Sequence, residues 1–178
     1  MPPPYLVRGR LYAPFYIFLR TRMADADLLA TFGIGDYTDS ADARGSHYAV
    51  VADDGEWTML ADDWGYTLWY RPTTWATIAE LGRTIDVFAG SVGEDDRSYD
   101  FAYYRGGRLA RKYAVSDLRG LVVEVDVGDP LPAEAARFDD ELDHVLALAA
   151  SLGIRSQYEE HEIRVYRSAE PGRRIVLG

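Results

Sequence analysis

The stretch SHYAVVADDGEWTMLAD, residues 46–62, constrains the fold more than any other part of the chain. Asp54-Gly55 is a dipeptide that favours a tight turn between two antiparallel strands. Pairing the strands around this turn places six side chains on one face: Tyr48, Val50, Ala52, Trp57, Met59 and Ala61. Leaving a large apolar side chain in water costs roughly 1.5–3 kcal/mol, so this face must be buried. The same pairing sets Asp53 opposite Glu56.

A second hairpin is predicted where Gly106-Gly107 separates SYDFAYYR from RLARKYAV. This register puts three aromatic residues on one face with part of the second strand: Tyr99, Phe101 and Tyr103 with Ala110, Lys112 and Ala114. Asp100 then lies on the other face, diagonal to Arg111. An ion pair between Asp100 and Arg111 on the surface of the sheet is the simplest interpretation of these two charges.

The spacing of apolar residues and the positions of turn-forming residues predict further strands and helices. Strands are predicted at 11–21, 84–90, 120–128, 161–168 and 173–178, and helices at 24–33, 71–83 and 133–153. In the strand GLVVEVDVG, alternation predicts one buried face made by Leu121, Val123, Val125 and Val127. Hairpins with interposed helices indicate an α+β fold. We expect one domain over residues 1–178, with 1–5 a loose end and two or three helices packed on a mainly antiparallel sheet of about 6–8 strands.

Composition limits the chemistry and the location of the chain. It has 178 residues, a net charge of −10 and no cysteine, which excludes disulfides, thiolate metal sites and cysteine nucleophiles. The start of the chain lacks a secretory pattern, and the apolar-rich run LYAPFYIFL is too short to span a bilayer. We expect a cytoplasmic protein without membrane contact. The negative charge argues against direct binding to nucleic acid, because phosphates are repelled.

Acidic residues are concentrated in two blocks. Residues 36–63 contain eight acids with Arg44 as their one base, and residues 124–143 contain eight acids with Arg137 as theirs. One interpretation is a solvated surface that keeps the protein soluble. The other is a pair of patches that contact a basic partner.

Motifs that carry chemistry are absent from the sequence. It contains no GxSxG, no P-loop, no HExxH and no GxGxxG after a strand. Asp140 and His144 share a helical face, but a metal site usually needs three or four convergent ligands. The segment GEDDRSYD lacks the glycine and the later glutamate of a calcium loop. We therefore expect no catalytic residue, no metal and no cofactor.

The segment DDWGYTLWYRP follows the first hairpin and combines aromatic and acidic residues. Trp64 and Tyr66 beside Asp62 and Asp63 would make a rigid aromatic patch with an acidic rim, which is a common way to build a protein interface. We predict that the partner-binding residues are Asp53, Asp54, Glu56, Asp62, Asp63, Trp64, Tyr66, Asp95 and Asp96.

In YAVVADDGEWTMLADDWG and VGEDDRSYDFAYYRGGRLARKYAV the chain resembles small cytoplasmic proteins of high-GC bacteria. Several of these are immunity proteins of polymorphic toxin systems, including the SUKH-type group. The resemblance lies in length, acidity, a tryptophan-bearing α+β order and GDPLPAE before a long helix. It implies a non-enzymatic protein that neutralises a toxin by covering it, and inhibitors of basic toxins often imitate phosphate.

Three functions therefore remain open. The first is a non-enzymatic acidic module that binds a basic protein, such as a toxin. The second is a small-molecule enzyme or ligand-binding domain, with a cleft lined by Trp64, Tyr66 and Tyr104 and served by Asp100 or His47. The third is an accessory protein that forms oligomers.

Overall fold

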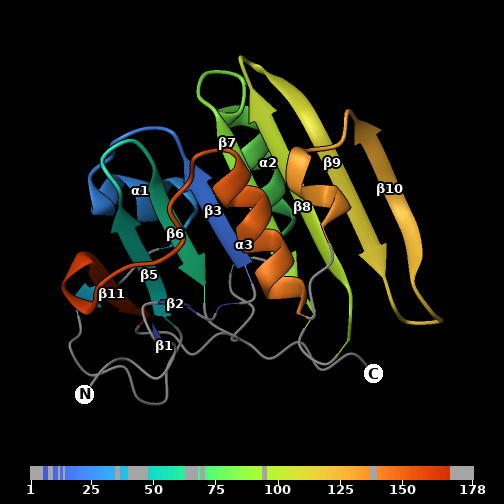
Figure 1. The fold of residues 1–178 in the computed structure, drawn as a ribbon. Coiled ribbons are helices and arrows are strands. Elements are labelled where there is room, and N and C mark those ends of the chain that lie inside the picture. The colour runs from blue at the N-terminus through green and yellow to red at the C-terminus, as the bar shows by residue number, and fades with distance from the viewer. Residues whose placement is uncertain are drawn as a thin grey trace.

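One antiparallel sheet runs through the whole molecule (Figure 1). In this computed structural model the described residues are 6–7, 10–11, 13, 15–34, 37–39, 48–62, 68, 71–93, 96–136 and 140–168. Within them, nine strands pair in the order β10-β9-β8-β7-β3-β6-β5-β11-β4. Every neighbouring pair is antiparallel. The predicted α+β class with a mainly antiparallel sheet is confirmed, and the predicted strand at 173–178 lies outside the described residues.

The elements have the following bounds. The nine strands of the large sheet are β3 (Phe15–Leu19), β4 (Tyr37–Asp39), β5 (Tyr48–Asp53), β6 (Thr58–Asp62), β7 (Val87–Val92), β8 (Tyr99–Arg105), β9 (Arg108–Ser116), β10 (Val122–Gly128) and β11 (Ile163–Ser168). A separate pair is formed by β1 (Leu6–Val7) and β2 (Arg10–Leu11). The helices are α1 (Asp25–Thr31), α2 (Pro72–Leu81) and α3 (Glu141–Ser151), with short 3-10 helices η1 (Pro132–Ala135) and η2 (Glu160–Glu162).

Helices cover both faces of the middle of the sheet. Helix α3 lies on one face, and α1 and α2 lie on the other (Figure 1). Strand β3 is buried on both sides: Tyr16 and Phe18 belong to the cluster under α3, whereas Phe15, Ile17 and Leu19 belong to the cluster under α1 and α2. This explains why the sequence of β3 is a continuous apolar run, since a strand between two helical layers has no solvated face.

The β5–β6 hairpin has the predicted buried face but a different turn. Asp53 pairs with Thr58, so the four residues 54–57 form the connection and Asp53 does not face Glu56. The predicted opposition of these two acids is therefore wrong. The register differs from the predicted one by two residues, and a shift of two returns each side chain to the same face. Val50, Ala52, Trp57, Met59 and Ala61 all lie in the cluster under α3.

The β8–β9 hairpin has its turn at Gly106-Gly107, as predicted, but an irregularity between Tyr103 and Tyr104 shifts the register. Tyr103 therefore pairs with Arg111, and Phe101 pairs with Tyr113. A shift of one residue exchanges the two faces of a strand. Arg111 thus points to the side of α3, and the predicted ion pair with Asp100 is wrong. Asp100 instead accepts a hydrogen bond from the Ser91 hydroxyl.

Helices α1 and α2 fall within their predicted ranges, with Pro72 in the first turn of α2. The third helix is shorter than predicted, because the chain from 132 to 135 forms η1 and α3 begins only at Glu141. Asp140 has an extended backbone and caps the helix, accepting a hydrogen bond from the Leu142 amide at 2.7 Å. A side-chain acceptor at this position satisfies an amide that has no partner within the helix.

Candidate partner-binding surface

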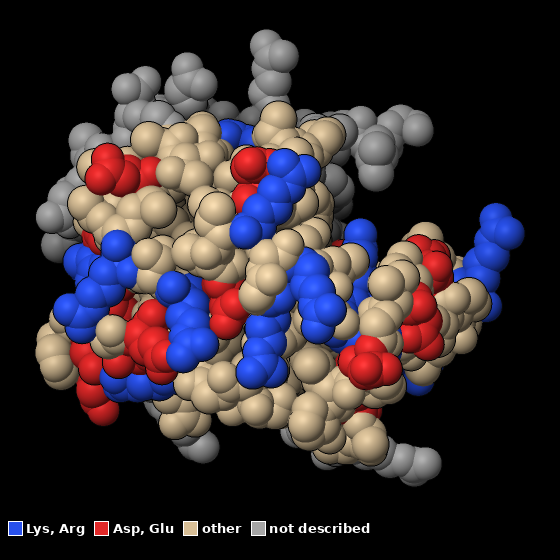
Figure 2. Space-filling model, turned by 90° about the horizontal axis from the view of Figure 1, so that it is seen from above, with Lys and Arg blue, Asp and Glu red and all other residues tan. Residues whose placement is uncertain are grey.

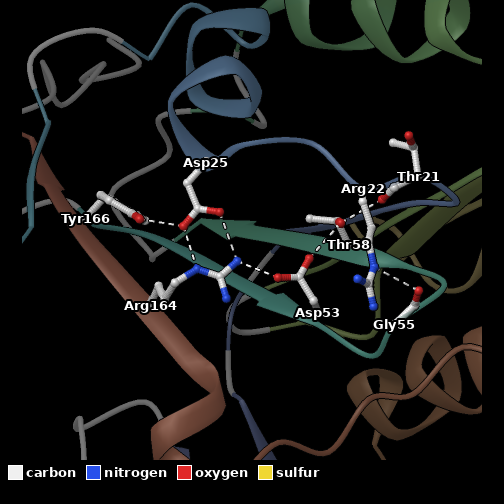
Figure 3. A network of polar contacts seen from close by, with 8 residues as sticks. All are labelled: Thr21, Arg22, Asp25, Asp53, Gly55, Thr58, Arg164 and Tyr166. Atoms are coloured by element: carbon white, nitrogen blue, oxygen red, sulfur yellow. Dashed lines mark hydrogen bonds and ion pairs between the residues drawn. The ribbon is translucent and has the colours of Figure 1, made fainter.

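Asp53, the first residue of the predicted site, belongs to an internal ion-pair network (Figure 3). Its Oδ2 accepts from Arg164 Nη2 at 2.6 Å, and its Oδ1 accepts from the Thr58 hydroxyl at 2.7 Å. The same guanidinium donates from Nε to Asp25 Oδ2 at 2.5 Å and from Nη2 to Asp25 Oδ1 at 2.9 Å. Tyr166 also donates to Asp25. The network joins β5, β6, β11 and α1. The carboxylate of Asp53 therefore holds these elements together.

The other described acids of the predicted site also have internal partners. Asp54 Oδ1 accepts from the amides of Trp57 at 2.7 Å and Glu56 at 3.0 Å, which closes the hairpin turn. Glu56 accepts from Arg20 Nε at 2.7 Å. Asp96 Oδ1 accepts from the Ser98 amide at 2.8 Å. The remaining predicted residues, Asp63, Trp64, Tyr66 and Asp95, lie outside the described residues, as does the side chain of Asp62. Partner binding by this set stays a prediction.

Strand β10 is the most exposed apolar element of the described chain. It lies at the edge of the sheet, beyond the helices (Figure 1). The exposed fractions are 84% for Leu118, 54% for Leu121, 52% for Val122, 52% for Val123 and 48% for Val127. The predicted burial of one face of this strand is therefore wrong. Exposed apolar residues at the edge of a sheet commonly mark a binding site, and we call these five residues, which lie on both faces of β10 and in the loop before it, the edge patch.

The two faces of β10 differ in chemistry. Asp126 pairs with Tyr113, whose ring contacts Phe101, so Asp126 lies on the side of α3. Val127 pairs with Lys112, whose ammonium lies 5.8 Å from the centre of the Trp75 ring on α2. Val127 therefore lies on the opposite side, as do Val125, paired with Ala114, and Val122, paired with Ser116. The strand thus presents a row of valines toward the side of α2 and an acidic residue toward the side of α3.

A groove of about 500 Å³ adjoins β10 on the side of α3. We call it the α3 groove; its lining is Arg97, Tyr99, Tyr113, Val115, Leu121, Val123, Glu134, Ala136, Asp140, Glu141 and His144. Leu121 and Val123 belong to the edge patch as well, so the groove and the patch share two residues. The Tyr99 ring centre lies 5.0 Å from that of His144 and 6.1 Å from that of Tyr113. The groove therefore combines aromatic walls with carboxylates.

Burial shifts the pKa of two aromatic groups of the groove in the direction that favours their uncharged forms. Burial raises the pKa of Tyr99 to about 12. Burial also lowers the pKa of His144 below its ordinary value, although Glu134 and Glu141 act in the opposite direction. The base in the groove, Arg97, is paired with Asp117 through Nε and Oδ2 at 3.0 Å. Its positive charge is therefore compensated locally.

Acidic residues surround this surface. Among the ion pairs of the described residues, none involves Glu124, Asp129 or Glu141, whereas Asp126 and Glu134 share Arg111. In Figure 2 acidic side chains lie on the lobe at the right of the view, from which basic side chains also project, and both kinds of charge occur nearer the centre. Three acids of the second acidic block, Glu134, Asp140 and Glu141, line the groove. A positively charged ligand is favoured here by the local field.

Arg111 holds β10 and η1 in place. Its side chain is 2% exposed and donates to Glu134 of η1, to Asp126 of β10, and to the carbonyl oxygens of Val127 at 3.2 Å and Gly128 at 2.9 Å. Gly128 has φ +85°, and a Cβ there would overlap the Ala110 carbonyl oxygen. The exposed strand is thus anchored by a buried cation on its inner side.

Sequence reasoning missed this surface because it assigned β10 to the core. The signals were present: an acidic block, and a valine-rich strand that itself carries two acids, Glu124 and Asp126. The alternative aromatic cleft receives little support from the described residues. Tyr104 packs in the cluster under α1 and α2, and Asp100 is bonded to Ser91. His47, Trp64 and Tyr66 lie outside the described residues.

Comparison with known proteins found no matching family model, no matching curated protein and no matching solved structure. No helix in the described part of the chain is long and apolar enough to cross a membrane. Within the same residues, no group of three or more acidic or histidine side chains is arranged to hold a metal ion.

Proposed function

We propose that this protein is a non-enzymatic binding module for a basic protein, and that the edge patch and the α3 groove form its contact surface. The observation that carries the proposal is the half-exposed apolar row on β10, bordered by carboxylates. Aromatic and apolar centres with a charged rim are typical of protein interfaces. The opposite charge on the partner provides steering and specificity.

Charge complementarity favours a basic partner over a second copy of this chain. Between Leu121 and Leu131 the chain carries Glu124, Asp126 and Asp129 and no basic residue. Two copies that paired through β10 would bring identical acidic rows against each other, and like charges opposed across strands are destabilising. A partner with lysine or arginine at those places would reverse the sign of the interaction. The resemblance to immunity proteins supplies one class of such partner, a basic toxin.

The test uses two capped peptides of about nine residues, the upper range of strand length. One alternates valine with lysine, and the other alternates valine with glutamate. In fluorescence anisotropy the valine–lysine peptide should bind and the valine–glutamate peptide should not. Raising the salt from roughly 50 to 300 mM should weaken binding about tenfold, mainly through slower association. Equal binding of both peptides, or binding of neither, would overturn the proposal.

Charge-reversal variants locate the contact. Glu124→Lys combined with Glu141→Lys should weaken binding of the valine–lysine peptide at least about tenfold, because two carboxylates that have no ion-pair partner among the described residues become cations. Asp27→Lys combined with Glu160→Lys is the matched control, because it changes the net charge equally and both residues are exposed outside the groove and the edge patch. It should bind as the unmodified protein does. Equal losses in the two variants would show that only net charge matters, and would remove the assignment to this surface.

A further inference from the structure

We infer that the partner contributes an extended segment that adds to the sheet as a strand beside β10. In the partner's added strand, apolar residues face the side of α2 and basic residues face the side of α3. The inference rests on the proposed function and specifies its mode of recognition. It concerns backbone pairing and side-chain order, neither of which follows from an acidic surface alone.

The first argument is that, among the described residues, no strand pairs with the outer edge of β10. β10 is the last strand of the nine-stranded order, and its hydrogen-bonded neighbour is β9 on the inner side. The amides and carbonyls on the outer side of an edge strand are a template for another strand. Edge strands are commonly protected by proline, by charged side chains, by β-bulges or by covering segments, and β10 has a register irregularity between Val123 and Val125. Residues 121–128 contain neither proline nor lysine.

The second argument is the sorting of side chains on the two faces of β10. On the side of α2 the strand presents Val122, Val125 and Val127, which would pack against apolar residues of an added strand. On the side of α3 it presents Val123 and Asp126. Because successive side chains of a strand point to opposite faces, the complementary segment alternates apolar and basic residues.

The third argument is the α3 groove. It lies on the acidic side of β10 and shares Val123 with that strand. A lysine or arginine on this side of an added strand would point toward the groove, whose lining includes Tyr99, Tyr113 and Glu141. Aromatic faces and carboxylates are the groups that attract such cations. A long basic side chain is therefore accommodated on the side of α3, and not on the side of α2.

The experiment separates backbone pairing from side-chain attraction. The valine–lysine peptide is prepared in two further forms, one with every valine amide N-methylated and one with every lysine amide N-methylated. In a strand, alternate amides point to opposite edges, so the two forms block opposite edges while keeping the same side chains and charge. If the peptide adds as a strand, the two forms should differ in affinity at least about tenfold, because several backbone hydrogen bonds are lost in one of them.

Each outcome has a distinct meaning. If the parent peptide binds and the two methylated forms bind equally, strand addition is overturned and the proposed function stands. If the parent peptide does not bind, the proposed function itself is overturned. Amide hydrogen exchange gives a second readout: binding should slow exchange within residues 122–128 and leave that of α2 unchanged. Unchanged exchange in β10 at saturating peptide would also overturn strand addition.

Discussion

The Arg111 guanidinium donates two parallel hydrogen bonds to the Glu134 carboxylate, from Nε to Oε1 at 2.8 Å and from Nη2 to Oε2 at 2.7 Å. Glu134 Oε1 also accepts from the Leu131 amide at 2.6 Å, which ties the start of η1 to the same carboxylate. In this bidentate ion pair the Arg111 side chain is 2% exposed and the Glu134 side chain is 12% exposed. It fixes one wall of the α3 groove and, through Asp126, the strand that carries the edge patch.

Arg111→Met should destabilise the protein by about 3–5 kcal/mol, because it leaves the Glu134 carboxylate buried without its cation. Urea unfolding measures the loss. The double variant Arg111→Met/Glu134→Leu should be less destabilised than Arg111→Met alone, since no unpaired charge remains. A double variant as unstable as the sum of the two single variants would show that the two residues do not interact.

Gly128→Ala should destabilise the protein by more than the roughly 1–3 kcal/mol expected from backbone strain alone. The residue has φ +85°, and the added Cβ also overlaps the Ala110 carbonyl oxygen on β9. Gly120→Ala is the matched control, because Gly120 has φ +92° but no atom within 4 Å of an added Cβ. Thermal unfolding of the two variants isolates the cost of the overlap. Equal losses of stability would refute the close approach of β9 and β10.

Val122→Thr combined with Val127→Thr should change the free energy of unfolding by less than about 1 kcal/mol, because both side chains are half exposed. Threonine keeps the branched shape and the strand preference of valine. The same variant should weaken binding of the valine–lysine peptide. Leu148→Ala provides the contrast: Leu148 is a fully buried residue of α3, and its truncation should cost about 2–5 kcal/mol. A large loss of stability in the threonine variant would mean that β10 belongs to the core.

The Asp25–Arg164 pair should contribute to acid unfolding. Burial opposes ionisation of Asp25, but hydrogen bonds from Arg164 and Tyr166 outweigh it and hold the pKa of this carboxyl below its ordinary value. A group whose pKa is lower in the folded state stabilises the fold above its unfolded pKa of about 4, and this contribution is lost as the pH falls below that value. Asp25→Asn should therefore lose less stability between about pH 4 and pH 2 than the unmodified protein.

Denaturant unfolding across that pH range provides the measurement, with Asp27→Asn as the control. Asp27 is exposed on the same helix, so its replacement changes the charge of α1 without touching Arg164. The Asp27→Asn variant should follow the unmodified protein on the acid side. If both substitutions reduce the loss of stability at low pH equally, the charge of the helix and not the ion pair is responsible.

Asp100→Asn should stabilise the protein at neutral pH. Burial raises the pKa of Asp100 above its ordinary value, although the Ser91 hydroxyl and Lys112 favour the ionised form. A raised pKa means that the folded state favours the protonated acid, so stability is present below the unfolded pKa and falls as the pH rises through the folded pKa. An asparagine can still accept the hydrogen bond from Ser91. The gain in stability should vanish below about pH 4. A gain that persisted there would show that burial of the ionised Asp100 carboxylate is not its cause.

The two hairpins show where sequence reasoning succeeds and where it fails. In β5–β6 the buried face was predicted correctly although the turn was wrong, because the register error was two residues. In β8–β9 the turn was right, but an irregularity beside Tyr103 shifted the register by one residue and turned Arg111 to the side of α3. Such an irregularity depends on twist and on cross-strand packing, which the local pattern does not contain.

The sequence by itself determined the α+β class, the positions of the two hairpins and of helices α1 and α2, and an acidic block at residues 124–143. Only the tertiary structure decided that β10 is an edge strand with half-exposed valines, and that the acids of the β5–β6 hairpin are held by Arg20 and Arg164. Alternation along a strand reveals which side chains share a face, because it depends on neighbouring residues. Whether that face is covered depends on helices and strands that are distant in the chain, and so it emerges only when the sheet is assembled.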